Sequence, residues 1–474
     1  MGQEIDSREF DADQFEEFSQ RLHRETARLE DWFRHDSFSA RGDRAGFELE
    51  ACLIGGDALP QPINEPFLQR LNDPLVVPEL ASFNVELNSS PVTLGANALS
   101  AMYQELEATW SRAREAATDL DARLVMIGIL PTVTQKELVL DNMSSLERYH
   151  GLNQQVLRMR GGRPIQIDIR GHQHLLIDHG DVMLESAATS FQIHLKTTQK
   201  DATRAFNLSK IISAPMVAIS ANSPFLFGRD LWSETRIPLF EQSVSVGGSD
   251  YSKRVTFGIR YVENSLVECF QANRDRYPVL LPMLDDHDPD TLPHLRLHNG
   301  TIWRWTRPLL GFDDDGTPHL RIEHRVTAAG PTTLDSIANA AFYFGLIYGL
   351  SEHGRELESK IPFVRAQKNF YAAAREGLSA KIIWSDGKPR VLSELILEHL
   401  LPAARKGLDH LGIDVEDARR FLGIIEDRAR FGRTGASWQR SWVASYGMDA
   451  EGLVESYLAG QESGKPVHAW PLSC

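Results

Sequence analysis

Four short stretches of this 474-residue chain alternate between polar and apolar residues: Phe47-Glu48-Leu49-Glu50-Ala51, Asn84-Val85-Glu86-Leu87-Asn88, Phe191-Gln192-Ile193-His194-Leu195 and Arg321-Ile322-Glu323-His324-Arg325. In a β-strand, successive side chains point to opposite faces, so each stretch has one polar face. The opposite faces of the first three stretches are apolar. The pattern predicts a sheet with an apolar back and a front of carboxylates, one imidazole and guanidinium groups.

One strand of this kind is a weak signal, because half-exposed antiparallel strands alternate routinely and their polar face often only contacts water. Four such strands, rich in Glu, Asn, Gln, His and Arg, favour a functional face. Mg²⁺ prefers oxygen ligands and shares them between carboxylates and substrate phosphates. We therefore expect a site for several magnesium ions and a polyphosphate, with Arg325 beside Glu323 to neutralise a transferring phosphoryl group. His194 is compatible with a structural role or with metal ligation.

The composition limits the class of protein. With 42% hydrophobic and 24% charged residues, the chain has the composition of a soluble globular protein. A net charge of −15 argues against nucleic-acid binding, and the basic stretch 158–163 is better explained as a solvated loop. No run approaches the roughly 18 apolar residues of a membrane span, and residues 1–35 contain no secretory signal. Cys52, Cys269 and Cys474 are too scattered for a disulfide framework, so we expect a cytoplasmic protein.

Hydrophobic periodicity and turn residues predict the remaining elements. Helices are expected at Asp11–Phe33, Leu99–Ala122 and Asp201–Ser213, the last stopped by Pro215. Strands are expected at Gly46–Leu53, Leu124–Leu130, Pro164–Ile169, Leu175–Asp178, Thr301–Pro308 and His319–Val326. Beyond Pro331 the pattern predicts helices at Leu334–Leu350, Gln367–Glu376, Leu392–Leu408, Asp414–Arg430 and Glu451–Ala459, with scarcely any strand.

Two aspartate-rich segments are interpreted as connections. Asp313-Asp314-Asp315-Gly316 predicts a hairpin turn, and 282–293 predicts a surface loop. Neither has the spacing of an EF-hand calcium loop.

Other sequence motifs of metal-binding, nucleotide-binding or hydrolase sites are weak or missing. His172, His174 and His179 invite a zinc interpretation, but no cysteine or carboxylate with suitable spacing accompanies them, and the flanking glycines favour a turn. The role of these histidines stays open. The chain has no Gly-x-Gly-x-x-Gly opening a helix, no Gly-x-x-x-x-Gly-Lys loop and no Gly-x-Ser-x-Gly elbow. A dinucleotide fold, a P-loop and a serine hydrolase are therefore disfavoured.

In their order and spacing, several segments resemble the glutamate-cysteine ligase family of the glutamine synthetase superfamily, particularly the branch that includes bacterial carboxylate-amine ligases. The resemblance spans about Phe47 to Pro331. It rests on Phe47–Glu50, Asn84–Pro91, Phe191–His194, Ala221-Asn222-Ser223-Pro224-Phe225 with Arg236, and Arg307-Pro308 followed by Ile322–Arg325. The C-terminal part resembles carboxylate-amine ligases in 372–377 and 435–439.

The resemblance implies roles for individual residues. The family's metal-binding positions fall on Glu48, Glu50, Glu86, His194 and Glu323, for Mg²⁺ with Mn²⁺ as an alternative. The expected catalytic residues are Glu323, Arg325 on the γ-phosphate and Arg236 on a substrate carboxylate, whose shape suits the arginine fork. Arg307 is expected to help Arg325 bind ATP, the co-substrate. Asn222, Asn88 and Gln192 are expected to contact substrate.

The implied fold is α+β: a curved, mostly antiparallel β-sheet funnel of the glutamine synthetase catalytic type, with outer helices and a helical C-terminal part. Residues 1–332 would form the ATP-dependent ligase core with its N-terminal helix. Residues 333–474 would form a helical part packed on the same domain.

The implied reaction joins glutamate to an amine through a γ-glutamyl phosphate, with cysteine as the first expected acceptor. The expected partners are these small molecules and ATP, without nucleic acid or membrane, and a homo-oligomer is compatible with the sequence. Three alternatives remain open: a ligase for another amine, a non-catalytic ligand-binding relative and a metal-dependent hydrolase. Two departures stand out: residues 326–331 lack an aspartate that members often carry there, and the redox cysteine pairs of plant enzymes have no counterpart.

Overall fold

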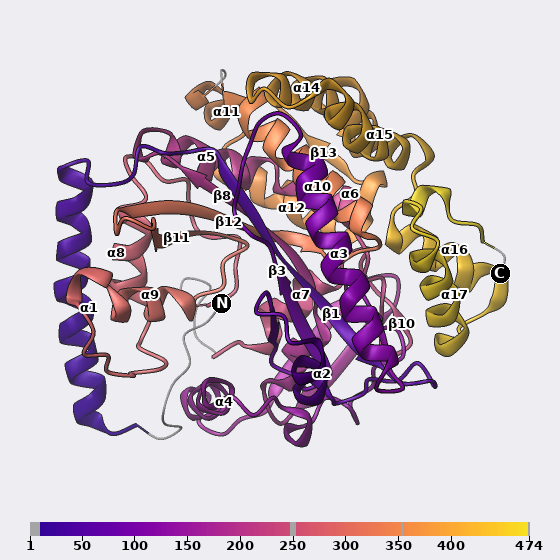
Figure 1. Ribbon diagram of the computed structural model, residues 1–474, viewed down its shortest axis with the longest axis horizontal. Helices are drawn as coiled ribbons and strands as arrows, with labels where there is room; N and C mark the ends of the chain where they lie inside the picture. Colours follow the sequence, from indigo (N-terminus) through magenta and orange to yellow (C-terminus); the bar gives the residue numbers. More distant parts are fainter. Residues whose placement is uncertain (1–9, 247–252, 352–353, 473–474) are drawn as a thin grey trace.

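A curved antiparallel sheet runs through the centre of the computed structural model, which describes residues 10–246, 253–351 and 354–472 (Figure 1). Its main strands are β1 (Arg44–Ile54), β2 (Val76–Pro78), β3 (Asn84–Asn88), β8 (Ser190–Thr197), β11 (Thr306–Phe312) and β12 (Pro318–Ala328). They lie in the order β11-β12-β8-β1-β3-β2, and each neighbouring pair is antiparallel. The short strands β4 (Val92–Thr93) and β5 (Arg123–Val125) pair with β1. The predicted α+β fold with a curved antiparallel sheet is confirmed.

The pairing register places the predicted polar residues on one face of the sheet. Glu50 lies opposite Glu86, and Glu48 lies opposite Gln192. On the other side of β8, His194 pairs with Glu323, which in turn pairs with Arg307. Residues directly opposite each other on antiparallel strands share a face, so side chains that are far apart in sequence meet here.

The reverse face of the sheet packs into the hydrophobic core. Phe47 and Phe191, from adjacent strands, have ring centroids 5.3 Å apart, and both side chains are almost fully buried. The helices that contact strands on this face are α5 (Gln199–Ile211), α6 (Ser213–Ser220) and α10 (Thr333–Gly349). His324 of β12 also points to this side, where it stacks on Tyr343 of α10 at 4.7 Å. Each fully buried apolar side chain of this kind contributes about 1.5–3 kcal/mol, which holds the sheet in one orientation.

The remaining elements surround this sheet. The other helices before residue 333 are α1 (Ala12–Arg34), α2 (Asn64–Leu71), α3 (Ala98–Thr118), α4 (Glu147–Met159), α7 (Arg236–Ser243), α8 (Val267–Arg276) and α9 (Pro293–Gly300). Those after α10 are α11 (Gly354–Lys360), α12 (Phe363–Glu376), α13 (Leu392–Leu395), α14 (Leu401–His410), α15 (Val415–Phe431), α16 (Gly435–Tyr446) and α17 (Ala450–Glu462). Three hairpins complete the set: β6 (Ile165–Arg170) with β7 (His174–His179), β9 (Phe225–Leu226) with β10 (Arg229–Asp230), and β13 (Lys381–Ile383) with β14 (Pro389–Val391). Among the described helices, none is long and apolar enough to cross a membrane.

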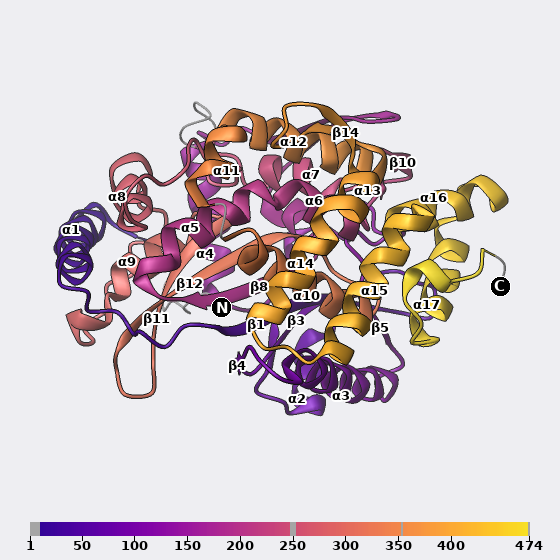
Figure 2. The same cartoon turned by 90° about the horizontal axis from the view of Figure 1, so that it is seen from above.

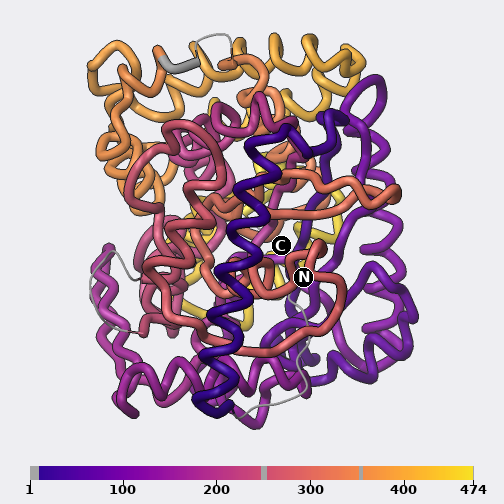
Figure 3. The backbone as a smooth tube through the Cα atoms, turned by 90° about the vertical axis from the view of Figure 1, so that its left-hand side faces the viewer, coloured from indigo at the N-terminus to yellow at the C-terminus, as the bar shows by residue number. Residues whose placement is uncertain are grey.

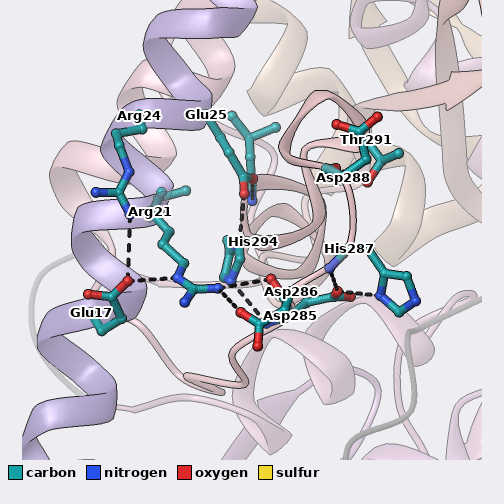
Figure 4. A network of polar contacts seen from close by, with 12 residues as sticks. Glu17, Arg21, Arg24, Glu25, Asp285, Asp286, His287, Asp288, Thr291 and His294 are labelled. Atoms are coloured by element: carbon teal, nitrogen blue, oxygen red, sulfur yellow. Dashed lines mark hydrogen bonds and ion pairs between the residues drawn. The ribbon is translucent and has the colours of Figure 1, made fainter.

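Helix α1 stands at one end of the longest axis, and α16 and α17 stand at the other (Figures 1 and 2). Helix α1 runs along the outside of the molecule and packs on α8 and α9 (Figure 3). Polar contacts tie it to the predicted loop 282–293, which is exposed at residues 286–290, contains a 3-10 turn at Pro289–Thr291 and leads into α9 at Pro293 (Figure 4). Arg21 contacts Asp286 at 2.8 Å, and the buried Glu25 contacts His294 at 2.5 Å.

The predicted boundary between residues 332 and 333 coincides with the first residue of α10. Behind it, Arg428 of α15 is fully buried and joins three helices. Its guanidinium donates hydrogen bonds to the carbonyl oxygen of Ile219 and to Asn339 Oδ1, both at 3.0 Å, and its Nε lies 3.6 Å from Asp335 Oδ1. The ion pair joins α10 to α15 within the helical part, and the bond to Ile219 connects α15 to α6 in the preceding part of the chain.

Several sequence predictions need correction. The strand expected over Leu124–Leu130 ends at Val125, because the next carbonyl groups bond outside the sheet: Tyr457 and Gln461 donate to the carbonyl of Met126. Pro215 does not end the helical region, because it occupies the first turn of α6, where a proline's missing N–H group costs nothing. The strand expected from Thr301 begins only at Thr306.

Other predictions are confirmed or lie outside the structure. The hairpin at Asp313–Gly316 and the helical C-terminal part are confirmed, and the helix expected over Leu392–Leu408 contains a π-helical stretch at Ile396–Leu400. Helix α16 and several short helices were not predicted. Cys52 and Cys269 are buried free thiols, whereas Cys474 lies outside the described residues.

Replacing Arg428 tests the buried ion pair between α10 and α15. We expect Arg428→Met to lower the free energy of unfolding by about 3–5 kcal/mol, because it leaves the Asp335 carboxylate buried without its partner. Chemical denaturation measures this. Arg430→Met is the matched control on the same helix, since Arg430 pairs with Glu426 at the exposed surface, and it should change stability by less than about 1 kcal/mol. Equal losses in the two variants would contradict the assignment.

Candidate active site

Two groups of possible metal ligands lie on the polar face of the sheet. The histidine group contains Glu48, His194 and Glu323, from β1, β8 and β12, and the glutamate group contains Glu50, Glu79 and Glu86. Within each group, one ligand atom from every residue lies within 4.8 Å of the others. The structure therefore brings all five predicted metal ligands into two adjacent groups.

Glu79 is the member of the glutamate group that sequence reasoning missed. It follows Pro78, the last residue of β2, a strand of three residues that is too short to show alternation. Its backbone N–H donates to the carbonyl of Asn84 at 3.3 Å, which continues the pairing of β2 with β3 and places Glu79 near Glu86. The available signal was a carboxylate close in sequence to a predicted active-face strand.

The ring nitrogen Nε2 of His194 has the surroundings of a cation ligand. It lies 3.4 Å from Glu48 Oε1 and 3.7 Å from Glu323 Oε1, and it is buried without a hydrogen-bond partner among the described residues. Burial lowers the pKa of His194 to about 4, so the imidazole is neutral at pH 7. A neutral nitrogen that faces two carboxylates is the donor set of a divalent-cation site, since the cation would satisfy all three.

Two arginines balance the charge of Glu323. Arg307 donates from Nη2 to Glu323 Oε1 at 3.0 Å and from Nε to Oε2, and Arg325 donates from Nη1 to Oε2 at 3.1 Å. Burial would raise the pKa of Glu323, but these guanidinium groups outweigh it and hold the pKa well below its usual range. Arg325 occupies a break in the register between β12 and β8, and such bulges re-aim a side chain at functional sites.

Gln192 connects the two groups. Its Nε2 donates to Glu50 Oε1 at 3.0 Å, and its Oε1 accepts a hydrogen bond from Arg325 Nη1. Asn88 similarly donates to Glu86 Oε1 at 3.0 Å. In this structure both amides orient charged groups, and their expected contact with substrate stays a prediction.

Two members of the glutamate group, Glu50 and Glu86, have raised pKa values. Burial and the charge of Glu79 raise the pKa of Glu50 to about 7. Hydrogen bonds from the backbone N–H and the hydroxyl of Ser190, at 2.7 and 2.9 Å, act in the opposite direction and lower it. Burial, together with the charges of Glu48 and Glu79, raises the pKa of Glu86 well above its ordinary value. Carboxylates forced together in this way are typical of sites that bind cations.

Arg236 and Asn222 lie beside the site and bond to the protein itself. Arg236, at the start of α7, is 2% exposed, and it donates to Glu234 Oε1 at 3.2 Å and to the carbonyl of Val326 at 2.6 Å. Asn222 is fully buried and donates to the carbonyl of Ala329 at 2.8 Å and to Tyr457 Oη at 2.7 Å. Both residues position segment 326–331, and the structure does not bring Asn222 into either ligand group.

The histidines of the β6–β7 hairpin do not converge on one point. Each ring contacts a different carboxylate: His172 with Asp230 at 3.0 Å, His174 with Asp168 at 2.8 Å and His179 with Asp181 at 2.9 Å. In the part of the chain that the structure describes, only the two groups on the sheet bring three candidate ligands together. The zinc interpretation therefore has no geometric support.

Solved structures with a similar fold are ligases. The glutamate–cysteine ligase of Francisella tularensis in complex with AMP aligns with a TM-score of 0.57 and 12% identity, over 92% of this chain and 91% of that one. A bifunctional glutathione synthetase from Pasteurella multocida aligns with a TM-score of 0.55 and 12% identity, over 91% of this chain and 54% of that one. No curated protein matches the sequence.

The chain therefore shares its fold with these two solved structures. The sequence profile of glutamate-cysteine ligase family 2 (GCS2) matches residues 45–459, which is most of the chain. The protein belongs to this family, and its class of enzyme is carboxylate–amine ligase.

The proton on Glu50 gives a prediction for the pH dependence of stability. Because its pKa rises from an ordinary 4.5 to about 7, protonation stabilises the fold most below pH 4.5, and this contribution is lost as the pH rises through 7. In the presence of a chelator, we expect Glu50→Gln to flatten the fall in stability between pH 5 and pH 8, as measured by denaturant unfolding at each pH. The control Glu17→Gln replaces an exposed carboxylate with a lowered pKa and should leave that slope unchanged. Parallel curves for Glu50→Gln and wild type would contradict the assignment.

Proposed function

We propose that the protein is an ATP- and Mg²⁺-dependent ligase that forms a γ-glutamyl amide through a γ-glutamyl phosphate, with cysteine as its first candidate acceptor. Family membership supports the ligase chemistry. The observation that carries the proposal is the histidine group, in which a neutral imidazole nitrogen faces two carboxylates and two arginines flank the same glutamate. This arrangement combines ligands for a cation with guanidinium groups for a phosphate.

The residues divide into three roles. The histidine group and the glutamate group would hold Mg²⁺, with Mn²⁺ as an alternative. When bound, the ions would supply positive charge to the polyphosphate and polarise the reacting phosphoryl group. Arg325 would stabilise the negative charge that develops on the γ-phosphoryl group, and Arg307 would help bind the polyphosphate. Arg236 would bind a carboxylate of glutamate.

The bonds made and broken follow from the acyl phosphate route. An oxygen of the γ-carboxylate of glutamate bonds to the γ-phosphorus as the bond to ADP breaks. The nitrogen of the amine then bonds to the activated carbonyl carbon, phosphate leaves, and the nitrogen releases its proton. Because the site is buried, Arg307, Arg325 and Gln192 hold fixed dipoles and charges where water would otherwise compete.

A ligase for another amine is the second candidate. Segment 326–331, which follows Arg325, contains no ionisable side chain, and its backbone is held by Arg236, Asn222 and Gln461. An acceptor pocket without a carboxylate at this position has less to bind the ammonium group of an amino acid. A ligand-binding relative without turnover is disfavoured, because it would retain two groups of crowded carboxylates without a use for them.

A panel of acceptors separates these candidates. Purified protein is incubated with ATP, Mg²⁺ and glutamate, and with cysteine, other amino acids or simple amines, and phosphate release and the product are measured. We expect release to require ATP and an amine, with cysteine the fastest acceptor. Cysteine that reacts no faster than other amines would remove the first candidate, and substrate hydrolysis without ATP would indicate a metal-dependent hydrolase.

Replacing Glu323 tests the histidine group. We expect Glu323→Gln to lower the rate by about 10²–10³-fold, because it removes a cation ligand and the carboxylate that orients Arg307 and Arg325. Glu48→Gln is the second variant, since Glu48 is not hydrogen-bonded to those arginines, and it should lose activity while retaining the wild-type fold by circular dichroism.

Glu25→Gln provides the matched control. Glu25 is also buried and paired, but its partner is His294 at the α1–α9 contact (Figure 4). This variant should retain activity. An unchanged rate in Glu323→Gln would discredit the assignment.

A further inference from the structure

Arg321 lies on the polar face beside the histidine group, and neither the resemblance nor the proposed mechanism gives it a role. It precedes Glu323 by two residues on β12, so both side chains point to the same face. Its partners in the sheet are Lys196 on β8 and Leu309 on β11. The charges that act on it most strongly are those of Glu48, Glu323 and Arg307.

The guanidinium of Arg321 has no partner. It is partly buried, and its Nε is enclosed without a hydrogen bond. Across residues 10–246, 253–351 and 354–472, no side-chain hydrogen bond, ion pair or ring contact engages it. Glu48 and Glu323 act on it only through their charge, without a direct bond, and an enclosed guanidinium that makes no hydrogen bond is unfavourable. An anion that binds there would satisfy it.

The other cations around it are already engaged. Arg307 and Arg325 bond to Glu323, Lys196 contacts Asp313 at 2.6 Å, and the guanidinium of Arg296 lies 5.7 Å from the centre of the Phe312 ring. Among the described side chains on this part of the sheet, Arg321 is therefore the cation whose whole guanidinium group is available to bind a ligand. An arginine fork suits two oxygens of a phosphate or a carboxylate.

The position of Arg321 favours a phosphate. Arg321, Glu323 and Arg325 follow one another on the same face, and at about 3.3 Å per residue the two arginines are about 13 Å apart along the strand. Arg307, opposite Glu323, lies between them. A polyphosphate whose terminal group lies at Arg325 would extend past Arg307 towards Arg321.

We propose that Arg321 is a nucleotide-binding residue that contacts a phosphate of ATP other than the transferred one. The proposal rests on the proposed function, since it requires that ATP binds on this face. It extends the nucleotide site by one residue beyond Arg325 and Arg307. The carboxylate of glutamate is the other anion that the same fork could bind, and the experiment separates the two.

Direct binding measurements test the role of Arg321. The dissociation constants of ADP and of a non-hydrolysable ATP analogue, with Mg²⁺, and separately of glutamate, are measured by calorimetry for wild type, Arg321→Gln and Arg321→Lys. We expect Arg321→Gln to weaken both nucleotides by about 10- to 100-fold, with glutamate unchanged, because charge-assisted bonds to phosphate are lost. Arg321→Lys should fall between, because it keeps the charge and loses the fork.

Two controls separate binding from folding. Arg41→Gln replaces a nearby arginine that already pairs with Asp313 and Asp315, and it should leave nucleotide binding unchanged. The unliganded Arg321→Gln protein should melt at the same temperature as wild type or higher, because it loses an unpaired enclosed charge. A lower melting temperature would indicate a structural role and overturn the proposal.

The remaining outcomes are also decisive. Nucleotide affinity that is unchanged in Arg321→Gln overturns the proposal, and a selective loss of glutamate affinity assigns the fork to the carboxylate instead. Wild-type protein that binds no nucleotide refutes the proposed function itself, which distinguishes that failure from a failure at Arg321 alone.

Discussion

The antiparallel register between β1, β3, β8 and β12 is the constraint on which the rest of the structure depends. It sets Glu50 against Glu86 and His194 against Glu323, and a slip of one residue would turn every one of these side chains to the opposite face. The apolar back of the sheet prevents that slip, because Phe47, Phe191 and their neighbours would then face the polar side. The same alternation therefore forms the core and assembles the ligand groups.

Assembling like charges has an electrostatic cost that the surrounding side chains only partly offset. Arg307 and Arg325 compensate the negative charge of Glu323. Gln192 connects the two groups, because it accepts a hydrogen bond from Arg325 and donates one to Glu50. The glutamate group has no arginine hydrogen-bonded to it among the described residues, and the pKa values of Glu50 and Glu86 are raised instead. The charges on this face thus favour cations at the two ligand groups, and the anion that we propose at Arg321 would bind beside them. That polarity suits a family of ligases whose substrates are a carboxylate, an amine and a nucleotide.

Sequence reasoning was most successful where a pattern has one physical cause. The alternation around Glu48, Glu86 and Glu323 predicted the sidedness of the sheet, because strand geometry leaves no other arrangement. It missed Glu79, whose strand is too short to alternate, and it could not recognise that Arg321 lacks a partner, because that depends on every neighbouring side chain. Pro215 was misinterpreted because a proline that ends one helix and a proline that begins the next look alike in sequence. Asn222 was assigned to substrate because the resemblance supplied a role, whereas its bonding to α16 and α17 depends on residues more than two hundred positions away.

The bonding between the C-terminal helices and the core has a consequence for the order in which the protein matures. Tyr457 and Gln461 hold the carbonyl of Met126, Gln461 also holds that of Pro331, and Gln439 and Tyr457 bond to the side chain of Asn222. These donors leave the ribosome after every candidate ligand on the sheet has been synthesised. A nascent chain thus contains all of its candidate cation ligands before it contains the side chains of α16 and α17 that hold the backbone behind Arg325 in place.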